Sequence, residues 1–232
     1  ISFGTWMMRI VSEKEEQHMR LAIGTTFNYD IPFEAMLPLV KNSGFDTISV
    51  GGRRDHSGYH TESGRKTIEK LTTKHKITID SIHAPLRLDG DISSSDERLR
   101  LSGIEAVDNG LDACYDLGVS ILILHLNKEF SEEELEHRIE SVLRSLPDIS
   151  DYARERGIRL AIENIPEDPS NAILQQTLET FPQDHVGVCY DSSHANLTQA
   201  PLEILDRYGR RVIALHISDN KGKLDDHALP FE

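Results

Sequence analysis

The sequence predicts an α/β protein built as a (β/α)₈ TIM barrel, and three observations support this fold. Seven short apolar segments alternate with longer amphipathic segments along the chain. The apolar segments are rich in Ile, Val and Leu, which is typical of strands buried on both faces of a parallel sheet. The first of them is followed by Gly24 to Asn28 without a G-x-G-x-x-G motif. A barrel is therefore favoured over a dinucleotide-binding open sheet, and we expect no nucleotide cofactor.

The predicted strands recur at intervals of about one β/α unit. They span residues 21–25, 47–51, 77–84, 120–126, 158–163, 186–191 and 212–217. A complete barrel has eight strands and typically takes about 250 residues, so we expect this chain to lack the eighth strand. Residues 20–232 are predicted to form one barrel domain that is incomplete at its C-terminal side. Residues 1–19 are predicted to be an N-terminal extension outside the fold, without the pattern of a signal peptide.

The segments between the strands have the hydrophobic spacing of helices. They span residues 32–42, 62–75, 95–117, 131–156, 170–180 and 201–208. Gly44 and Gly118 follow two of these segments, as expected for C-terminal caps. Ser131 and Glu134 form a capping box at the start of another. Pro147 is expected to kink or divide that helix, because proline cannot donate a backbone hydrogen bond.

Composition limits the partners that the protein can have. The chain carries 25 Lys and Arg against 39 Asp and Glu, a formal net charge of −14 that makes a nucleic-acid partner unlikely. No apolar run approaches the roughly 20 residues of a membrane span. The two cysteines, Cys114 and Cys189, lie in apolar patterns and are interpreted as core residues rather than a disulfide. We expect a cytoplasmic protein that binds a small molecule. The sequence leaves open whether the chain forms a homo-oligomer.

Histidines and carboxylates gather where the predicted strands end, which is the edge at which barrels carry their chemistry. These residues are His83, His125, Glu163, Asp191, His194 and His216, with Asp225 and His227 in the loop after the last strand. A single histidine of this kind would be interpreted as a satisfied core residue. Together they predict a divalent-metal site, because mixed imidazole and carboxylate ligands suit Zn²⁺, Mn²⁺ or Co²⁺, and carboxylate-rich subsets suit Mg²⁺.

The spacing of three of these residues supports a shared site. Glu163 and Asp191 are 28 residues apart, and Asp191 and His216 are 25 residues apart. Each interval is about one β/α unit, so the three side chains are expected on neighbouring strands at the same edge.

Four residues are predicted to bind substrate. His125 ends the strand at 120–126, and Asn164 follows the strand at 158–163, where its amide can equally cap a helix. Glu167 lies in the loop after that strand, where an acid binds substrate hydroxyls or is merely solvated. Lys221 lies after the last strand, where its ammonium can hold a phosphate, although a Gly-Lys loop without a role fits equally well.

At these residues the sequence resembles the xylose isomerase-like superfamily of barrels, which includes sugar isomerases and epimerases, inosose dehydratases and endonuclease IV-type DNA-repair enzymes. The resemblance covers residues 20–232. It rests on IHAP at 82–85, IEN at 162–164, YDSSH at 190–194, HISDNKG at 216–222 and DDH at 225–227. The last blocks look most like the sugar phosphate isomerase/epimerase branch. The motifs are specific for the superfamily and not for a substrate.

In the sugar branch, the resemblance implies one metal ion on Glu163, Asp191 and His216, completed by a glutamate of the eighth strand. Glu163 would then also transfer a proton through an enediolate, with His194 and His83 holding substrate oxygens. The same site in the dehydratases would expel water from a polyol or keto acid.

In the endonuclease branch, the resemblance implies a multi-zinc site that cleaves DNA at abasic positions. The matching ligands are His83, His125, His194, Asp225 and His227. The acidic charge and short loops favour the sugar branch, whereas Asp225 and His227 are ligands that a one-metal mechanism does not need. An inactive metal-binding barrel is the third alternative.

Overall fold

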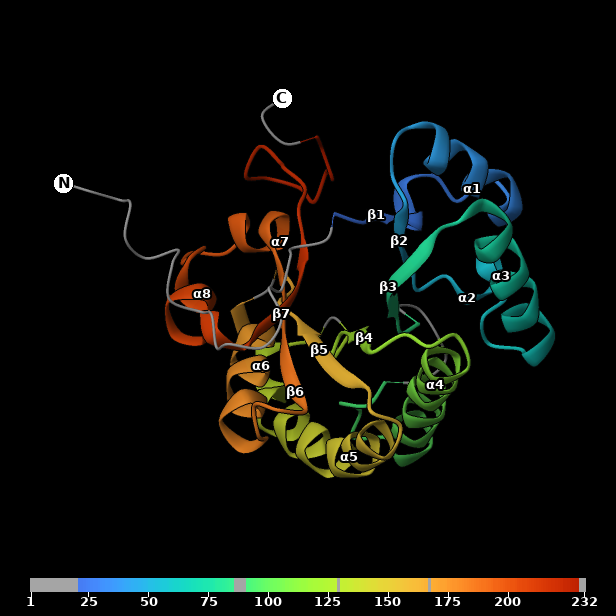
Figure 1. Cartoon of the computed structure of the whole chain (residues 1–232). Helices are drawn as coiled ribbons and strands as arrows, with labels where there is room; N and C mark the ends of the chain where they lie inside the picture. Colours follow the sequence, from blue (N-terminus) through green and yellow to red (C-terminus); the bar gives the residue numbers. More distant parts are fainter. Residues whose placement is uncertain (1–20, 86–90, 129, 167, 230–232) are drawn as a thin grey trace, which may run out of the picture.

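The computed structural model describes residues 21–85, 91–128, 130–166 and 168–229, which form a curved sheet wrapped by helices (Figure 1). The strands are β1 (Ile23–Gly24), β2 (Thr47–Val50), β3 (Thr78–His83), β4 (Ile121–Leu124), β5 (Arg159–Glu163), β6 (Val186–Asp191) and β7 (Val212–His216). All pairings are parallel and the strand order follows the chain, with β1 and β7 at the two edges. This seven-stranded half-barrel confirms the predicted fold class. The predicted extension at 1–19 lies outside the described residues.

The helices lie on the outer face of the sheet. The longer ones are α1 (Phe33–Asn42), α3 (Glu62–His75), α4 (Glu97–Asp116), α5 (Leu135–Glu155), α6 (Asp168–Thr180) and α8 (Glu203–Tyr208). Two short helices, α2 (Arg54–Ser57) and α7 (Ser192–Asn196), were not predicted. Gly44 and Gly118 have φ angles of 91° and 66°, as expected of glycines that end helices. Within the described ranges, no helix is long and apolar enough to cross a bilayer.

Helix α5 corrects one expectation. It continues through Pro147 as a single helix from Leu135 to Glu155, so the prediction that Pro147 divides it is wrong. Val142, Leu146 and Ile149 of α5 are completely buried in the main core. Their burial on both sides of the proline outweighs the roughly 3 kcal/mol that an interior proline costs.

Alternation along the strands separates the core from the site. Leu122, Leu124, Leu160, Ile162, Val186 and Val188 pack outward in the main core. Ile123, Ala161 and Cys189 form a second cluster on the inner face. Because strand side chains alternate between faces, the positions two residues further on, His125, Glu163 and Asp191, also face inward at the C-terminal edge of the sheet. The fold thus carries the predicted ligands on one inner rim.

Candidate metal centre

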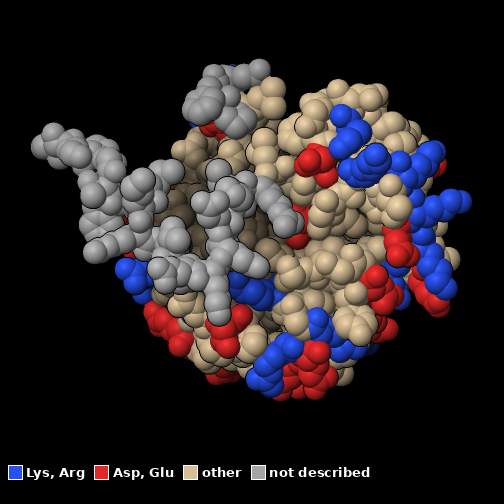
Figure 2. Space-filling model, viewed as in Figure 1, with Lys and Arg blue, Asp and Glu red and all other residues tan. Residues whose placement is uncertain are grey.

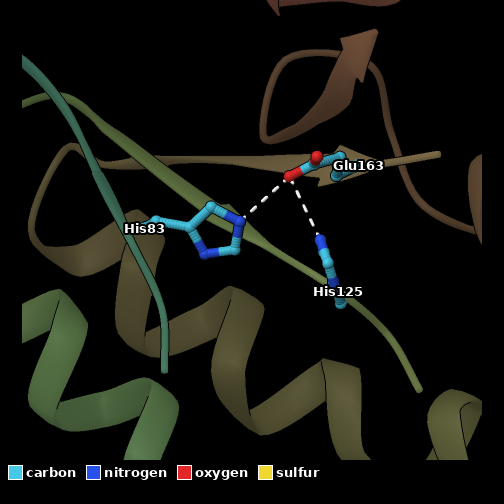
Figure 3. Close-up of side chains that lie close together, drawn as sticks. All are labelled: His83, His125 and Glu163. Carbon is cyan, nitrogen blue, oxygen red and sulfur yellow. Dashed lines mark hydrogen bonds and ion pairs between the residues drawn. The ribbon is translucent and has the colours of Figure 1, made fainter. Parts of the chain in front are cut away.

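Glu163 lies at the centre of the site, and its two oxygens face different histidines. Its side chain is 3% exposed, and Oε2 lies 2.9 Å from Nε2 of His83 and 3.2 Å from Nε2 of His125 (Figure 3). The other oxygen, Oε1, lies 3.0 Å from Nδ1 of His216 and 3.4 Å from Nδ1 of His194. A carboxylate placed in this way can offer one oxygen to each of two cations.

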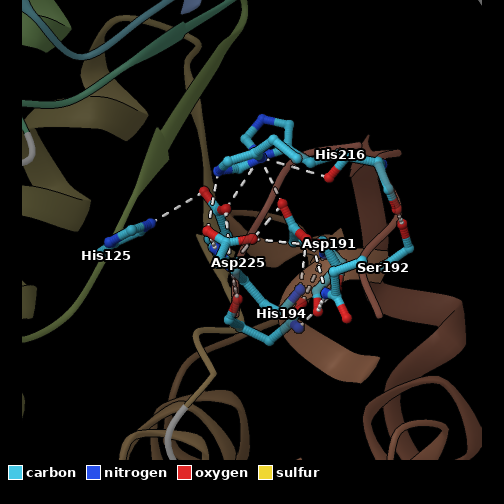
Figure 4. A network of polar contacts seen from close by, with 12 residues as sticks. His125, Asp191, Ser192, His194, His216 and Asp225 are labelled. Carbon is cyan, nitrogen blue, oxygen red and sulfur yellow. Dashed lines mark hydrogen bonds and ion pairs between the residues drawn. The ribbon is translucent and has the colours of Figure 1, made fainter. Parts of the chain in front are cut away.

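Asp191 lies at the end of β6, the strand next to that of Glu163, and its two oxygens have different partners. Figure 4 shows it between His194 and His216. Its Oδ1 accepts a 2.8 Å hydrogen bond from the backbone N–H of His194, which caps the start of α7. Its Oδ2 lies 3.6 Å from Nδ1 of His216 and 3.9 Å from Nδ1 of His194. The end of β6 therefore brings a carboxylate and an imidazole to the same place.

Asn164 fixes the positions of Asp191 and His194 through hydrogen bonds to both. It is 1% exposed, its Nδ2 donates to the carbonyl of Asp191 at 3.0 Å, and its Oδ1 accepts from the N–H of Asp191 at 2.8 Å. Its backbone carbonyl accepts a 2.9 Å hydrogen bond from Nδ1 of His194. The amide predicted to bind substrate is instead engaged with the backbone of a predicted ligand.

A third set of ligand atoms lies at the outer side of the rim. Oδ2 of Asp225 lies 3.2 Å from Nε2 of His194 and 2.9 Å from Nε2 of His227. The loop that carries Asp225 and His227 is closed by antiparallel backbone pairing of Asp219 with Ala228. His227 has a φ angle of 48°, a left-handed conformation that is uncommon for residues other than glycine.

The hydrogen bonds of His83 show that the donor set fits a cation. Nδ1 of His83 lies 2.7 Å from the carbonyl of Ala84, and a carbonyl only accepts, so Nδ1 carries the proton. In the neutral ring, Nε2 then presents a lone pair to Oε2 of Glu163 at 2.9 Å. Two acceptors this close need a proton or a metal ion between them. Burial lowers the pKa of His83, although the hydrogen bond to Glu163 acts in the opposite direction. The lowered pKa disfavours a second proton on the His83 ring, which leaves the metal ion as the favoured partner of both acceptors.

Two further atoms fit a cation in the same way. Nε2 of His125 is buried beside Glu163 but has no aligned hydrogen-bond partner. His194 donates through Nδ1 to a carbonyl, so its neutral ring also presents a lone pair to a carboxylate, that of Asp225. Buried nitrogens that face carboxylate oxygens are what a Zn²⁺-type site requires.

Burial and mutual charge act against each other in this cluster. Burial alone would raise the pKa of Glu163, but the imidazoles of His216 and His125 outweigh it and hold that pKa well below its usual range. Burial alone would lower the pKa of His216, but the carboxylate of Glu163 acts together with Cys189 and Asp191 to outweigh it and raise that pKa well above its usual range. For His194, the charges of Asp191 and Glu163 likewise outweigh burial and raise the pKa. The central carboxylate is therefore ionised at neutral pH, as a metal ligand must be.

The structure brings together most of the residues predicted from the sequence. Among the described residues, four groups have ligand atoms within 4.8 Å of one another: His83–His125–Glu163, Glu163–Asp191–His194, Glu163–Cys189–His216 and His194–Asp225–His227. They include all five predicted metal ligands. His125, predicted to contact substrate, lies in the group with His83 and Glu163. Lys221 is exposed in the loop after β7, and Glu167 lies outside the described residues.

Sequence reasoning missed three buried residues at this site. Cys189 was interpreted as a core residue, yet it also lies beneath Glu163 and His216. Ser193 and Asn220 were part of the quoted motifs without a role of their own. Their contacts depend on how the loop after β7 folds back, and no spacing rule signals that.

The comparison with known families identifies the type of barrel. A profile of the xylose isomerase-like TIM barrel matches residues 37–232. The chain belongs to this family. Among solved structures with the same fold, a D-tagatose 3-epimerase-like protein has a TM-score of 0.78 at 20% identity, covering 90% of this chain and 79% of that one. The TTHB071 protein from Thermus thermophilus, soaked with ZnCl₂, has a TM-score of 0.67 at 21% identity, covering 90% and 80%.

One curated relative is more similar in sequence. The uncharacterised protein y4fM of Sinorhizobium fredii is 36% identical over 141 residues, covering 57% of this chain and 45% of the relative. A second curated relative is covered over 58% of its length. This xylose isomerase-like chain thus spans about half the length of the curated relatives that it matches.

Proposed function

We propose that this xylose isomerase-like barrel is a divalent-metal-dependent isomerase or epimerase of sugars or sugar phosphates. The observation that carries the proposal is the convergence of Glu163, Asp191 and His216 with His83 and His194 at the buried inner rim. Carboxylate and imidazole ligands of this kind suit Mn²⁺, Zn²⁺ or Co²⁺, and a carboxylate-rich subset suits Mg²⁺.

The residues would share the work as follows. Glu163, Asp191 and His216 would hold the ion, which supplies Lewis-acid polarisation of a substrate carbonyl when bound. Glu163, ionised in its surroundings, would accept the proton from the carbon next to that carbonyl and leave an enediolate. A second acid, which the resemblance implies is a glutamate of an eighth strand, would return a proton to the other carbon or the other face. His83 and His194 lie beside the Glu163 carboxylate and would hold substrate oxygens.

The charge of the molecule supports a small substrate. With a formal net charge of −14, the chain repels a nucleic-acid backbone. On the face shown in Figure 2, Lys and Arg side chains lie mainly along the outer edge, over α3 and α5, and are interspersed with Asp and Glu. A sugar needs no long basic groove, and the epimerase-like solved relative supports the same substrate class.

Substitution of Glu163 tests the proton transfer. Glu163→Gln keeps a neutral oxygen ligand but cannot accept a proton, so turnover should fall by at least about 10²–10⁴-fold. The assay is exchange of a substrate C–H proton with D₂O, followed by NMR across ketoses and ketose phosphates. Glu69→Gln, an exposed position on α3, is the matched control and should exchange normally. Exchange that persists in Glu163→Gln would assign the base to another group.

A second candidate function is favoured by one observation, the ligand group of His194, Asp225 and His227, which does not contain Glu163. The two oxygens of Glu163 face different histidines and can each hold an ion, so this group provides ligands for a third, which suits hydrolysis of a phosphodiester such as that of abasic DNA. Elemental analysis separates the candidates, since one ion per chain supports sugar chemistry and three support phosphodiester chemistry. Cleavage of abasic-site DNA that Glu163→Gln abolishes would replace the isomerase proposal.

A further inference from the structure

Two residues outside the ligand groups connect the loop after β7 to the start of α7. Ser193 is completely buried, and its Oγ donates to Oδ1 of Asp225 at 2.9 Å. Asn220 is 8% exposed, and its Nδ2 donates to both the carbonyl and the Oγ of Ser193, each at 2.7 Å. Asn220, Ser193 and Asp225 thus form a continuous chain of hydrogen bonds, which we call the Asn220–Ser193 relay.

The direction of this relay is fixed at its far end. Oδ1 of Asn220 accepts hydrogen bonds from Nδ2 of Asn196 and from the N–H of Gly222, both at 2.8 Å. The amide group can therefore direct only its Nδ2 toward Ser193. Because the Ser193 hydroxyl accepts from Asn220, its single proton is directed to Asp225.

The relay determines which oxygen of Asp225 faces the site. Oδ1 is occupied by Ser193, and Oδ2 is left toward His194 and His227 at 3.2 and 2.9 Å. The loop that carries Asp225 needs such a tether, because residues 221–227 are exposed. Ligands on an exposed loop would otherwise lose conformational freedom when an ion binds.

We propose that Ser193 and Asn220 are positioning residues that preorganise Asp225 for a cation held with His194 and His227. The inference rests on a metal-dependent function as proposed above, in its multi-ion form, in which His194, Asp225 and His227 hold an ion of their own. It adds residues that touch neither that ion nor the substrate. A native chain that binds a single ion, on Glu163, Asp191 and His216, would overturn it. Hydrogen-bond partners of metal ligands typically contribute about 10–100-fold to metal affinity. Removing the relay should therefore weaken one ion and leave the ions around Glu163 bound.

The chain offers a matched control in the adjacent residue. Ser192 also connects the start of α7 to the same loop, since its Oγ donates to the carbonyl of Ser218 at 2.8 Å, but its hydroxyl meets no carboxylate there. Ser193→Ala should lower the affinity for the ion held by His194, Asp225 and His227 by about 10–100-fold. Ser192→Ala should leave that affinity within about threefold of the native value. Asn220→Asp, which keeps the size but removes the donor, should behave like Ser193→Ala.

The experiment is a Zn²⁺ titration against a competing chelator, with the bound ions counted by elemental analysis. Equal Zn²⁺ affinities in Ser193→Ala and the native chain would overturn the relay, as would equal losses in the Ser192 and Ser193 variants. A native chain that binds no ion would instead contradict the proposed metal-dependent function. In that case, a double-mutant cycle of Ser193→Ala and Asp225→Asn in chelator-treated protein still tests the relay. Additive effects on unfolding would contradict it.

Discussion

At the scale of single residues, the site depends on side chains that hold ligands as much as on the ligands themselves. Asn164 is the clearest case, because its amide closes two hydrogen bonds on the backbone of Asp191. Both the nitrogen and the oxygen of that amide are engaged in these two hydrogen bonds. Asp191 is held in place by these two hydrogen bonds, which we call the Asn164 bracket, and by its own side-chain cap on α7.

Removing this bracket should weaken both the fold and the metal site. Asn164→Ala leaves the buried N–H and C=O of Asp191 without these partners, so the free energy of unfolding should fall by about 1–3 kcal/mol. Zn²⁺ affinity should fall by about 10–100-fold. Urea unfolding with a chelator present and Zn²⁺ titration measure the two effects separately.

A second buried asparagine provides the control. Asn127 donates to Ser170 and to the carbonyl of Lys128 and touches none of the predicted ligands in these contacts. Asn127→Ala should destabilise the fold while leaving Zn²⁺ affinity unchanged. An Asn164→Ala protein that binds Zn²⁺ as tightly as the native chain would show that the bracket does not position Asp191.

At the residue scale, the sequence predicted those positions that strand alternation and the spacing of β/α units determine. His83, His125 and Glu163 follow inward-facing positions at strand ends, and this is visible in the pattern of apolar segments. The amide of Asn164 was assigned to substrate or to a cap because its real partner is a backbone 27 residues away. Contacts of this kind depend on how neighbouring strands stagger, which composition does not encode.

At the scale of elements, α4 carries a carboxyl group that the packing does not satisfy. Oδ1 of Asp108 is buried without a hydrogen-bond partner. Burial raises the pKa of Asp108 to about 6, and the charge of Asp112 on the same helix adds to the shift. The folded state therefore holds this proton more tightly than the unfolded state, in which an aspartate has a pKa of about 4.

This difference predicts how stability depends on pH. Between about pH 4 and pH 6 the folded state binds the extra proton, so its contribution to stability falls as the pH rises through that window. Asp108→Asn removes the ionisation and should stabilise the protein above pH 6 by about 1 kcal/mol, a value reduced because the side chain is only half-buried. Below pH 4 the gain should vanish.

Urea unfolding at pH 4, 5.5 and 7.5 measures this effect. Leu101→Ala, at an exposed position of α4, is the control, because it removes no ionisable group and its effect should be the same at each pH. A gain from Asp108→Asn that is the same at all three pH values would contradict the assignment to this carboxyl group.

Helices were predicted well where they are long enough for their hydrophobic residues to show the helical period. Helices α3 and α5 have 14 and 21 residues, so their apolar spacing and caps are evident. Helix α7 has five residues and α2 only four, too few for the helical period to be visible. Pro147 was misjudged because an intrinsic propensity was weighed without the tertiary packing that opposes it.

At the scale of the whole molecule, ion binding and folding should be coupled. The ligands come from β3 to β7 and the loop after β7, so their mutual arrangement exists only in the folded chain. An ion that binds only the folded state adds about 2.7 kcal/mol of stability at 100 times its dissociation constant.

Removing divalent ions should therefore lower the melting temperature. For a chain of this length, about 2.7 kcal/mol corresponds to a shift of roughly 5–10 °C. Calorimetry of the full chain with excess Zn²⁺ and with excess chelator measures it. Asp191→Asn should gain less stability from the same Zn²⁺ concentration, and identical melting curves of the native chain in both conditions would contradict the coupling.

The distribution of the ligands over the sheet has a consequence for engineering. Among the described residues, every member of the ligand groups lies in or after β3, and β1, β2 and their helices contribute none. One residue of their loops does support a predicted ligand, because buried Tyr59 donates a 3.1 Å hydrogen bond to the carbonyl of His83. Exposed loop positions such as Phe27, Asn28, Arg53 and Asp55 can be varied without altering a predicted ligand. Under the proposed function, they are the natural place to build a library that redirects substrate choice.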